Sequence, residues 1–138
     1  MPNLSEYSST KPIKMLCVGD SGKGKTGALA SLAEAGFKLR ILDYDNGIGI
    51  LASLLKGKPA LANVVFESCL DEYQTLGGKI IPKGMPKAFS KGLSLLTKWN
   101  DLGSVSDWKK DTILVIDSLS HMSNAALVFV LAMNGRSG

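Results

Sequence analysis

The sequence predicts an α/β fold, in which a parallel sheet is flanked by helices. Short apolar runs alternate along the chain with longer segments that carry helix signals. Strands separated by helices return through right-handed crossovers, which makes the sheet parallel. The composition fits this class, because 45% of the 138 residues are hydrophobic and 20% are charged. We expect a flexible leader at residues 1–12 and one domain over residues 13–138.

Each strand and helix of this fold has its own sequence signal. Strands are predicted at residues 13–18, 39–42, 63–66 and 112–116, and the first two of these are expected to be buried. Helices are predicted at residues 26–35, 48–55, 87–99 and 123–133. Gly36 and Gly57 follow two of these helices, as is typical of the left-handed residue that ends a helix. The rest of 67–110 is predicted as loop because it contains Gly77, Gly78, Pro82, Gly84 and Pro86.

The charge and cysteine content exclude several classes of protein. Sixteen Lys and Arg against twelve Asp and Glu give a net charge of +4, which permits an anionic partner without implying one. Cys17, expected in a core strand, and Cys69 are too few for a disulfide framework and fit a reducing compartment. The longest apolar run, residues 125–133, is shorter than the ~18 residues that cross a bilayer. With no signal peptide in its polar start, the chain is expected to be cytoplasmic, without a membrane partner.

The segment between the first predicted strand and the first predicted helix matches the phosphate-binding pattern G-x-x-x-x-G-K-[ST]. Glycines let successive backbone N–H groups point at an anion, and the following helix adds its positive N-terminal end. Lys25 is expected to reach the β- and γ-phosphates of a nucleotide, and the Thr26 hydroxyl to ligate Mg²⁺. The expected binding set is Gly19, Asp20, Ser21, Gly22, Lys23, Gly24, Lys25, Thr26 and Gly27. The alternative is a glycine-rich turn with a solvated lysine.

Acidic residues close two of the predicted strands. Asp117 follows the run 112–116, where it either holds Mg²⁺ beside the phosphate loop or caps the next helix. Asp43 and Asp45 follow the run 39–42, and either one positions the attacking water or is a solvated turn acid. Because ligands bind at the carboxyl edge of parallel strands, we expect the acids and the phosphate loop at one edge of the sheet.

The order of these motifs resembles that of RecA-like P-loop ATPases: a phosphate loop, a strand ending in acid-x-acid, and a later strand ending Val-Ile-Asp-Ser. The amino-acid sequence also resembles that of phage-encoded AAA/RecA-like ATP-binding proteins, some of which are single-strand annealing recombinases. The similar segments are residues 19–26, 41–46, 108–122 and 125–136. The resemblance implies the strand order 5-1-4-3-2, with the Asp117 strand beside the phosphate-loop strand. It also implies a further strand and a polar sensor residue after Gly138, so we expect a RecA-like domain that lacks its C-terminal strands.

The resemblance implies magnesium-dependent ATP binding and hydrolysis, serving phage DNA recombination or replication. Lys25 would stabilise charge, Thr26 and Asp117 would organise Mg²⁺, and Asp45 would orient the attacking water. Lys25, Asp45 and Asp117 are therefore the expected catalytic residues. The family has a glutamate where this chain has Asp45, which is one methylene shorter. The alternative is a non-hydrolysing module that binds nucleotide or a partner protein.

Two sets of basic residues bear on partners. The resemblance implies a homo-oligomer in which a neighbour supplies an arginine or lysine to the site, and the only arginines are Arg40 and Arg136. The predicted irregular insertion at about 71–110 is rich in lysine. The part of the insertion without acidic residues contains Lys79, Lys83, Lys87, Lys91 and Lys98. These lysines either contact the phosphates of single-stranded DNA or form a solvated loop face. Four of these lysines have a spacing of four, which would align them on a helix face if prolines did not interrupt it.

Three further side chains have an interpretation from sequence. Trp99 and Trp108 flank the lysine-rich segment, where they pack under the loop or stack on bases. The only histidine, His121, follows Asp117 closely and either senses the γ-phosphate or lines a helix start.

Overall fold

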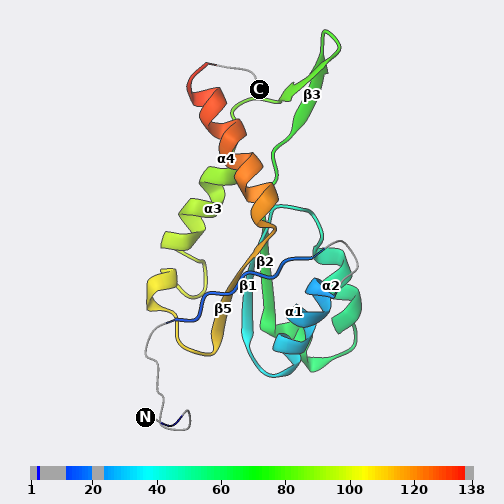
Figure 1. Cartoon of the computed structure of the whole chain (residues 1–138), viewed down its shortest axis with the longest axis vertical. Coiled ribbons are helices and arrows are strands. Elements are labelled where there is room, and N and C mark those ends of the chain that lie inside the picture. The colour runs from blue at the N-terminus through cyan, green and yellow to red at the C-terminus, as the bar shows by residue number, and fades with distance from the viewer. Residues whose placement is uncertain (1–2, 4–11, 20–23, 136–138) are drawn as a thin grey trace.

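A three-stranded parallel sheet lies at the centre of the computed structural model (Figure 1). The structure describes residues 3, 12–19 and 24–135. The strands are β1 (Lys38–Asp43), β2 (Val64–Ser68) and β5 (Thr112–Asp117), in the order β2-β1-β5. β1 is central, and every residue in it except the first is buried. The strands predicted at 39–42, 63–66 and 112–116 are therefore confirmed.

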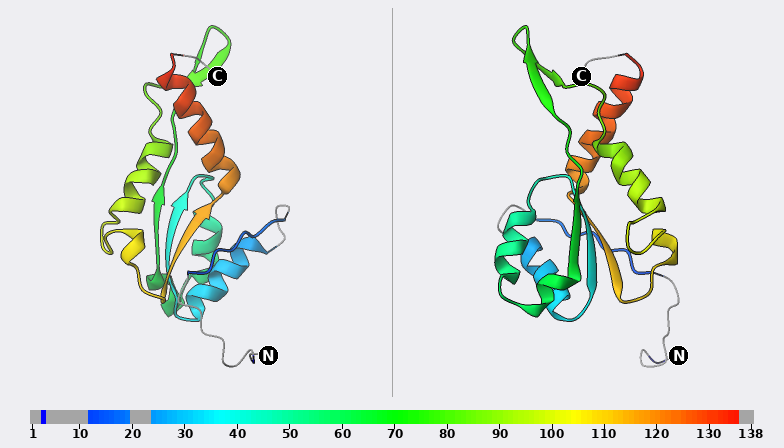
Figure 2. Two further views of the ribbon diagram at one scale, coloured as in Figure 1. Left: turned by 60° about the vertical axis from the view of Figure 1, so that its left-hand side comes forward. Right: turned by 180° about the vertical axis from the view of Figure 1, so that it is seen from behind.

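Helices cover both faces of this sheet (Figures 1 and 2). α1 (Lys25–Glu34) and α2 (Ile48–Leu55) pack on one face, and α3 (Ala88–Thr97) and α4 (Leu119–Met133) pack on the other. Two short 3-10 helices, η2 (Pro59–Asn63) and η3 (Val105–Asp107), lie in the connections. This arrangement confirms the prediction of an α/β chain whose parallel sheet is flanked by helices.

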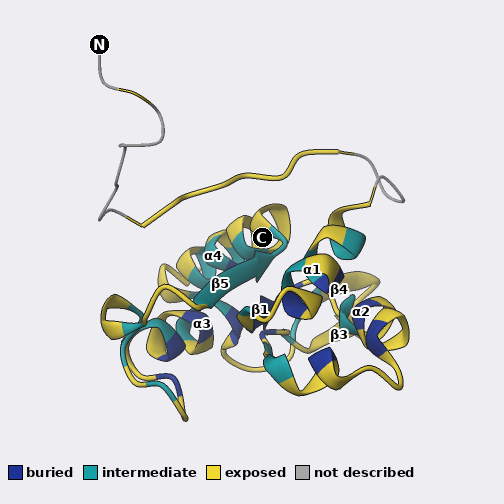
Figure 3. Ribbon diagram, turned by 90° about the horizontal axis from the view of Figure 1, so that it is seen from below, coloured by how far each residue is buried: buried dark blue, intermediate teal, exposed yellow. Residues whose placement is uncertain are grey.

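The central strand contributes to two hydrophobic cores because its side chains alternate between the faces. Leu39 and Ile41 are 0% and 1% exposed and pack with the small and aliphatic residues of α1 and α2. Leu42, 1% exposed, faces the other way and packs with Trp99 and with residues of α3 and α4. Figure 3 shows this buried strand between the two helical layers.

The helices begin and end close to where the sequence places them. α2 spans the predicted residues, and α1 and α3 differ from the predicted 26–35 and 87–99 by one or two residues at each end. α4 begins at Leu119, four residues before the predicted start at residue 123, because the Ser118 side chain accepts the His121 backbone N–H and caps the helix earlier. The described helices include none long and apolar enough to cross a membrane.

A β-hairpin projects from the body of the molecule, beyond one end of the sheet (Figures 1 and 2). It pairs β3 (Tyr73–Leu76) with β4 (Lys79–Pro82) in antiparallel register. Gly77 and Gly78 form its two-residue turn with φ of 58° and 76°, left-handed values that such tight turns require. The prediction of loop for most of 67–110 is wrong here, because the paired glycines are a hairpin turn.

The strand predicted at residues 13–18 is wrong. Residues 12–19 belong to no strand or helix and run across the outside of the molecule toward α1 (Figures 1 and 3). Their apolar side chains lie in solvent, and Ile13 and Val18 are 92% and 86% exposed. Cys17 is also exposed, so its predicted place in the core is wrong. An apolar run favours burial, but a strand also needs a neighbour to pair with its backbone.

The predicted strand order 5-1-4-3-2 also differs from the structure. β5, which ends in Asp117, pairs with β1 and not with residues 13–18. The fully buried β1 takes a partner on each edge, so β2 and β5 lie on either side of it. The predicted leader, residues 1–12, lies outside the described residues apart from residues 3 and 12.

Candidate functional site

Two aspartates lie opposite each other where β1 and β5 end. Asp43 and Asp117 are the last residues of these strands and are Cα partners in the parallel register. The Asp117 side chain points toward the loop after β1, since a Cβ on Gly47 would lie 4.0 Å from Asp117 Oδ2. Asp45 lies in the same loop. The expected gathering of these three acids at the carboxyl edge of the sheet is therefore confirmed.

Asp43 is the most deeply buried of the three acids, with 0% of its surface exposed. Its Oδ1 accepts the backbone N–H groups of Asp45 and Gly47, both at 3.2 Å. Its Oδ2 is buried without a hydrogen-bond partner in the part of the chain that the structure describes. A buried, half-satisfied carboxylate is costly, because its charge is removed from water without full compensation. Asp43 is thus an acceptor suited to a cation or a donor brought by a ligand.

Four neighbouring charged or titratable groups affect the pKa of Asp117. Burial raises the pKa of the Asp117 carboxyl, and the nearby carboxylates of Asp43 and Asp45 raise it further. His121 and Lys25 act in the opposite direction on the same pKa. Each of these groups is therefore close enough to affect the charge of Asp117.

The phosphate-loop motif is described in part. Asp20, Ser21, Gly22 and Lys23 lie outside the described residues. Gly24 is the N-cap of α1, with φ of 88°, a left-handed value suited to glycine. Lys25 donates from Nζ to the Gly19 carbonyl. Thr26 and Gly27 follow in the first turn of α1, half-buried, so the described part of the motif lies at a helix N-terminus as predicted.

His121 links the two strand ends through side-chain contacts. Its Nε2 lies 3.2 Å from Asp45 Oδ1, and its Nδ1 lies 2.7 Å from Ser118 Oγ. Ser118 directly follows Asp117, and His121 is in the first turn of α4. Sequence analysis singled out His121 as a phosphate sensor or a helix-start residue, and its contact with Asp45 was not predicted.

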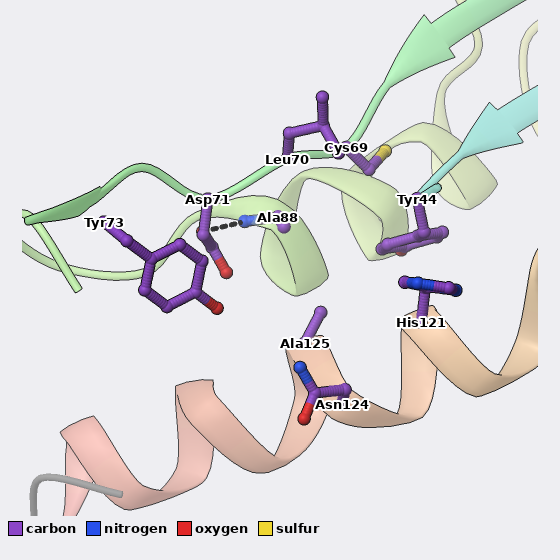
Figure 4. Close-up of a pocket in the computed structure, with 9 residues that line it drawn as sticks. All are labelled: Tyr44, Cys69, Leu70, Asp71, Tyr73, Ala88, His121, Asn124 and Ala125. Atoms are coloured by element: carbon purple, nitrogen blue, oxygen red, sulfur yellow. Dashed lines mark hydrogen bonds between the residues drawn. The ribbon is translucent and has the colours of Figure 1, made fainter. Parts of the chain in front are cut away.

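A small pocket of about 140 Å³ lies next to this cluster, on the α3 and α4 side of the sheet (Figure 4). Its lining residues are Tyr44, Cys69, Leu70, Asp71, Tyr73, Ala88, His121, Asn124 and Ala125. Burial raises the pKa of Tyr44 to about 12 and raises that of the Cys69 thiol. Both groups therefore stay protonated near neutral pH, and Cys69 lacks the thiolate that a nucleophile needs. Sequence analysis missed this pocket, whose walls come from four separate segments.

The predicted lysine set is divided between the hairpin and α3. Lys79 and Lys83 lie in or just after β4, whereas Lys87, Lys91 and Lys98 lie in or beside α3. Lys83 Nζ is 3.9 Å from Glu72 Oε2, and Lys91 Nζ is 3.1 Å from Glu67 Oε2 and donates to the Ser68 carbonyl. Alignment of the lysines along one helix face is excluded, because Lys79 is in a strand and Lys83 directly follows it, outside α3.

The two tryptophans and Arg40 have structural roles. Trp99 is 1% exposed and stacks edge-to-face with Trp108, at 5.7 Å between ring centroids, which confirms packing under the loop. Arg40 is 6% exposed and bonds to Asp101 at 2.6 Å, so it is not placed to reach a neighbouring subunit. The other arginine, Arg136, lies outside the described residues.

The donor set fits Mg²⁺ better than a metal that needs an all-protein cage. Within the described residues, no three His, Cys, Asp or Glu side chains converge as a metal site. Mg²⁺ usually keeps several waters and takes one or two carboxylates together with substrate phosphates. Asp117 and Asp43, which are Cα partners at the strand ends, are carboxylates of the kind that such a site uses. Comparison with family models, with curated proteins and with solved structures found no match for this chain.

Proposed function

We propose that this chain binds a magnesium nucleotide and hydrolyses ATP at the carboxyl ends of β1 and β5. The observation that carries the proposal is that Asp43, Asp45 and Asp117 lie at that edge of the sheet, with Lys25 close enough to lower the pKa of Asp117. The Asp43 carboxylate oxygen that no donor among the described residues reaches adds support, because it is a buried acceptor open to a ligand. The glycine-capped start of α1 supplies the complementary half, a set of N–H donors for phosphate.

The phosphates would be bound by α1. Its first N–H groups and the Lys25 ammonium carry the positive charge that a triphosphate requires. Thr26 and Asp117 would hold Mg²⁺, which when bound neutralises charge on the phosphate oxygens. Asp43 reinforces the negative potential beside Asp117.

Asp45 would serve the attacking water. Its exposed carboxylate lies on the loop after β1, next to the pair formed by Asp43 and Asp117. As the water oxygen bonds to the γ-phosphorus, the bond from the γ-phosphorus to the bridging oxygen breaks, ADP leaves, and the water proton passes to Asp45. Lys25 would stabilise the charge that develops on the γ-phosphoryl oxygens.

We propose single-stranded DNA as the partner of this ATPase, in phage recombination or replication. We also propose that the chain assembles with copies of itself. Among the described residues, Lys79, Lys87 and Lys98 make no ion pair, and these three lysines have their charge available for backbone phosphates. The exposed apolar residues of α4, of which Leu127, Val130 and Met133 are 50–64% exposed, offer a surface for a second copy.

The test is phosphate release from Mg-ATP, with and without single-stranded DNA, in the wild type, Lys25→Ala and Asp45→Asn. Both substitutions are expected to lower turnover by roughly 100-fold or more. Asp111→Asn is the matched control, because Asp111 precedes β5 at the opposite end of the sheet and pairs with Lys38. Nucleotide binding without phosphate release in the wild type would instead support the non-hydrolysing module.

A further inference from the structure

We infer that His121 is a positioning residue that holds Asp45 where it can orient the attacking water. This inference rests on the proposed function. Its basis is the contact between His121 Nε2 and Asp45 Oδ1 at 3.2 Å, which joins the first turn of α4 to the loop after β1. Ser118, whose Oγ lies 2.7 Å from the other ring nitrogen, completes the chain.

Asp45 needs such a partner because its side chain is 46% exposed. Its backbone is already fixed, since its N–H donates to the buried Asp43 carboxylate and the next residue, Asn46, is in the left-handed region at φ 56°. The carboxylate itself still rotates unless a side chain holds it. Positioning matters in this chemistry, because a displacement of about 1 Å in a reacting group costs about 100-fold in rate.

The contacts of His121 favour one tautomer of the neutral ring. In a neutral ring, the tautomer that satisfies both contacts has its proton on Nε2, so that Nε2–H donates to Asp45 and Nδ1 accepts from the Ser118 hydroxyl. The Ser118 oxygen also accepts the His121 backbone N–H at 3.4 Å, so the serine is fixed as the cap of α4. Figure 4 shows the imidazole facing the Tyr44 ring, and both residues line the pocket.

The kinetic test compares His121→Leu with His121→Gln. Leucine removes the donor, and we expect kcat to fall roughly 10- to 100-fold with little change in nucleotide affinity. Glutamine has an amide N–H that donates to Asp45, and it should recover part of the loss. Ser123→Ala, on the exposed side of the same helix, is the matched control and should leave kcat unchanged.

A double-mutant cycle separates positioning from a general effect on structure. In an Asp45→Asn background, His121→Leu should change kcat by about twofold or less, because its target is already lost. Equal losses in both backgrounds would overturn the inference. Circular dichroism of each variant shows whether it folds. If His121→Leu does not fold, the same two backgrounds are compared with His121→Gln.

A spectroscopic measurement tests the contact without turnover. Because His121 is the only histidine, ¹⁵N-histidine labelling gives a single set of imidazole signals. We expect the wild type to show the Nε2-protonated form, and Asp45→Ala to change the ¹⁵N shifts of Nε2. Unchanged shifts would overturn the contact. If the wild type releases no phosphate from Mg-ATP, the proposed function and the positioning role are both wrong. If the wild type hydrolyses ATP and His121→Leu has the same kcat, only the role of His121 is wrong.

Discussion

The central sheet and the projecting hairpin contain the same kinds of residue in opposite environments. In β1, Ile41 is 1% exposed and lies between two helical layers. In β4, Ile80 is 73% exposed, and the hairpin packs against no other strand in the described residues. A two-stranded hairpin is marginally stable alone, so its stability comes from its turn and its anchorage, whereas that of the sheet comes from burial. The same type of residue in a strand therefore contributes differently to stability according to its burial.

The largest expected difference is in the free energy of unfolding when a core isoleucine or a hairpin isoleucine is replaced by alanine. Ile41→Ala removes buried methyl groups and leaves a cavity, so we expect the free energy of unfolding to fall by about 2–5 kcal/mol. Ile80→Ala removes exposed groups and should change it by less than about 0.5 kcal/mol. Urea unfolding followed by circular dichroism measures both. Similar losses would mean that the hairpin is packed against another surface in solution.

Two helical glycines provide a second, smaller contrast. A Cβ on Gly92 in α3 would overlap the Tyr44 hydroxyl and lie 3.0 Å from its Cζ, whereas one on Gly49 in α2 meets nothing within 4 Å. Gly92→Ala should therefore lower stability by about 1–3 kcal/mol by displacing a buried ring, despite its better helix propensity. Gly49→Ala should raise stability by about 0.5–1 kcal/mol. Thermal unfolding of the pair measures the contrast, and a gain in both would contradict the packing of Tyr44.

The hairpin lysines should affect DNA binding more than the paired lysine of α3. Lys79 is on the hairpin and makes no ion pair with any residue that the structure describes, whereas Lys91 is bound to Glu67 and to the Ser68 carbonyl. Lys79→Ala should reduce the slope of log affinity against log salt by about 0.7 for single-stranded DNA. Lys91→Ala should change that slope less. Fluorescence anisotropy of a labelled oligonucleotide at several salt concentrations gives both slopes, and equal slopes for the two variants would refute the difference.

The smallest expected effect is the pH dependence contributed by Asp117. Because burial and neighbouring carboxylates raise its folded pKa above the ordinary 3.8, the folded state holds a proton that the unfolded state has lost. Stability is therefore lost as pH rises from about 4 through the raised pKa. Asp117→Asn carries no charge, so it should be more stable than the wild type at pH 7, and the difference should shrink toward pH 4. Urea unfolding at both pH values tests the sign.

Much of the fold follows from the sequence because burial acts on short apolar runs. The runs at 39–42 and 112–116 are sheet strands, and the run 48–55 is a helix with the same bounds. The run at 13–18 has the same character but is exposed, because its place depends on which strand edge pairs with it. Pairing is a property of the whole fold, and no local pattern encodes it.

The candidate site was predictable only where residues follow strand ends. Asp43, Asp45 and Asp117 come directly after apolar runs, so the shared edge of a parallel sheet brings them together. The contact of His121 with Asp45 depends on how α4 leaves β5, and the pocket beside it draws on Cys69 and Asn124 from distant segments. Such contacts follow from packing angles, which residue spacing does not determine.

Isothermal titration of the full chain with Mg-ATP tests the central claim most directly. We expect saturable heat for one nucleotide per chain, retained in Asp111→Asn and at least ~10-fold weaker in Lys25→Ala, which removes the phosphate-binding ammonium. Absence of heat from folded wild-type protein, or equal affinity in Lys25→Ala, would contradict nucleotide binding by the start of α1.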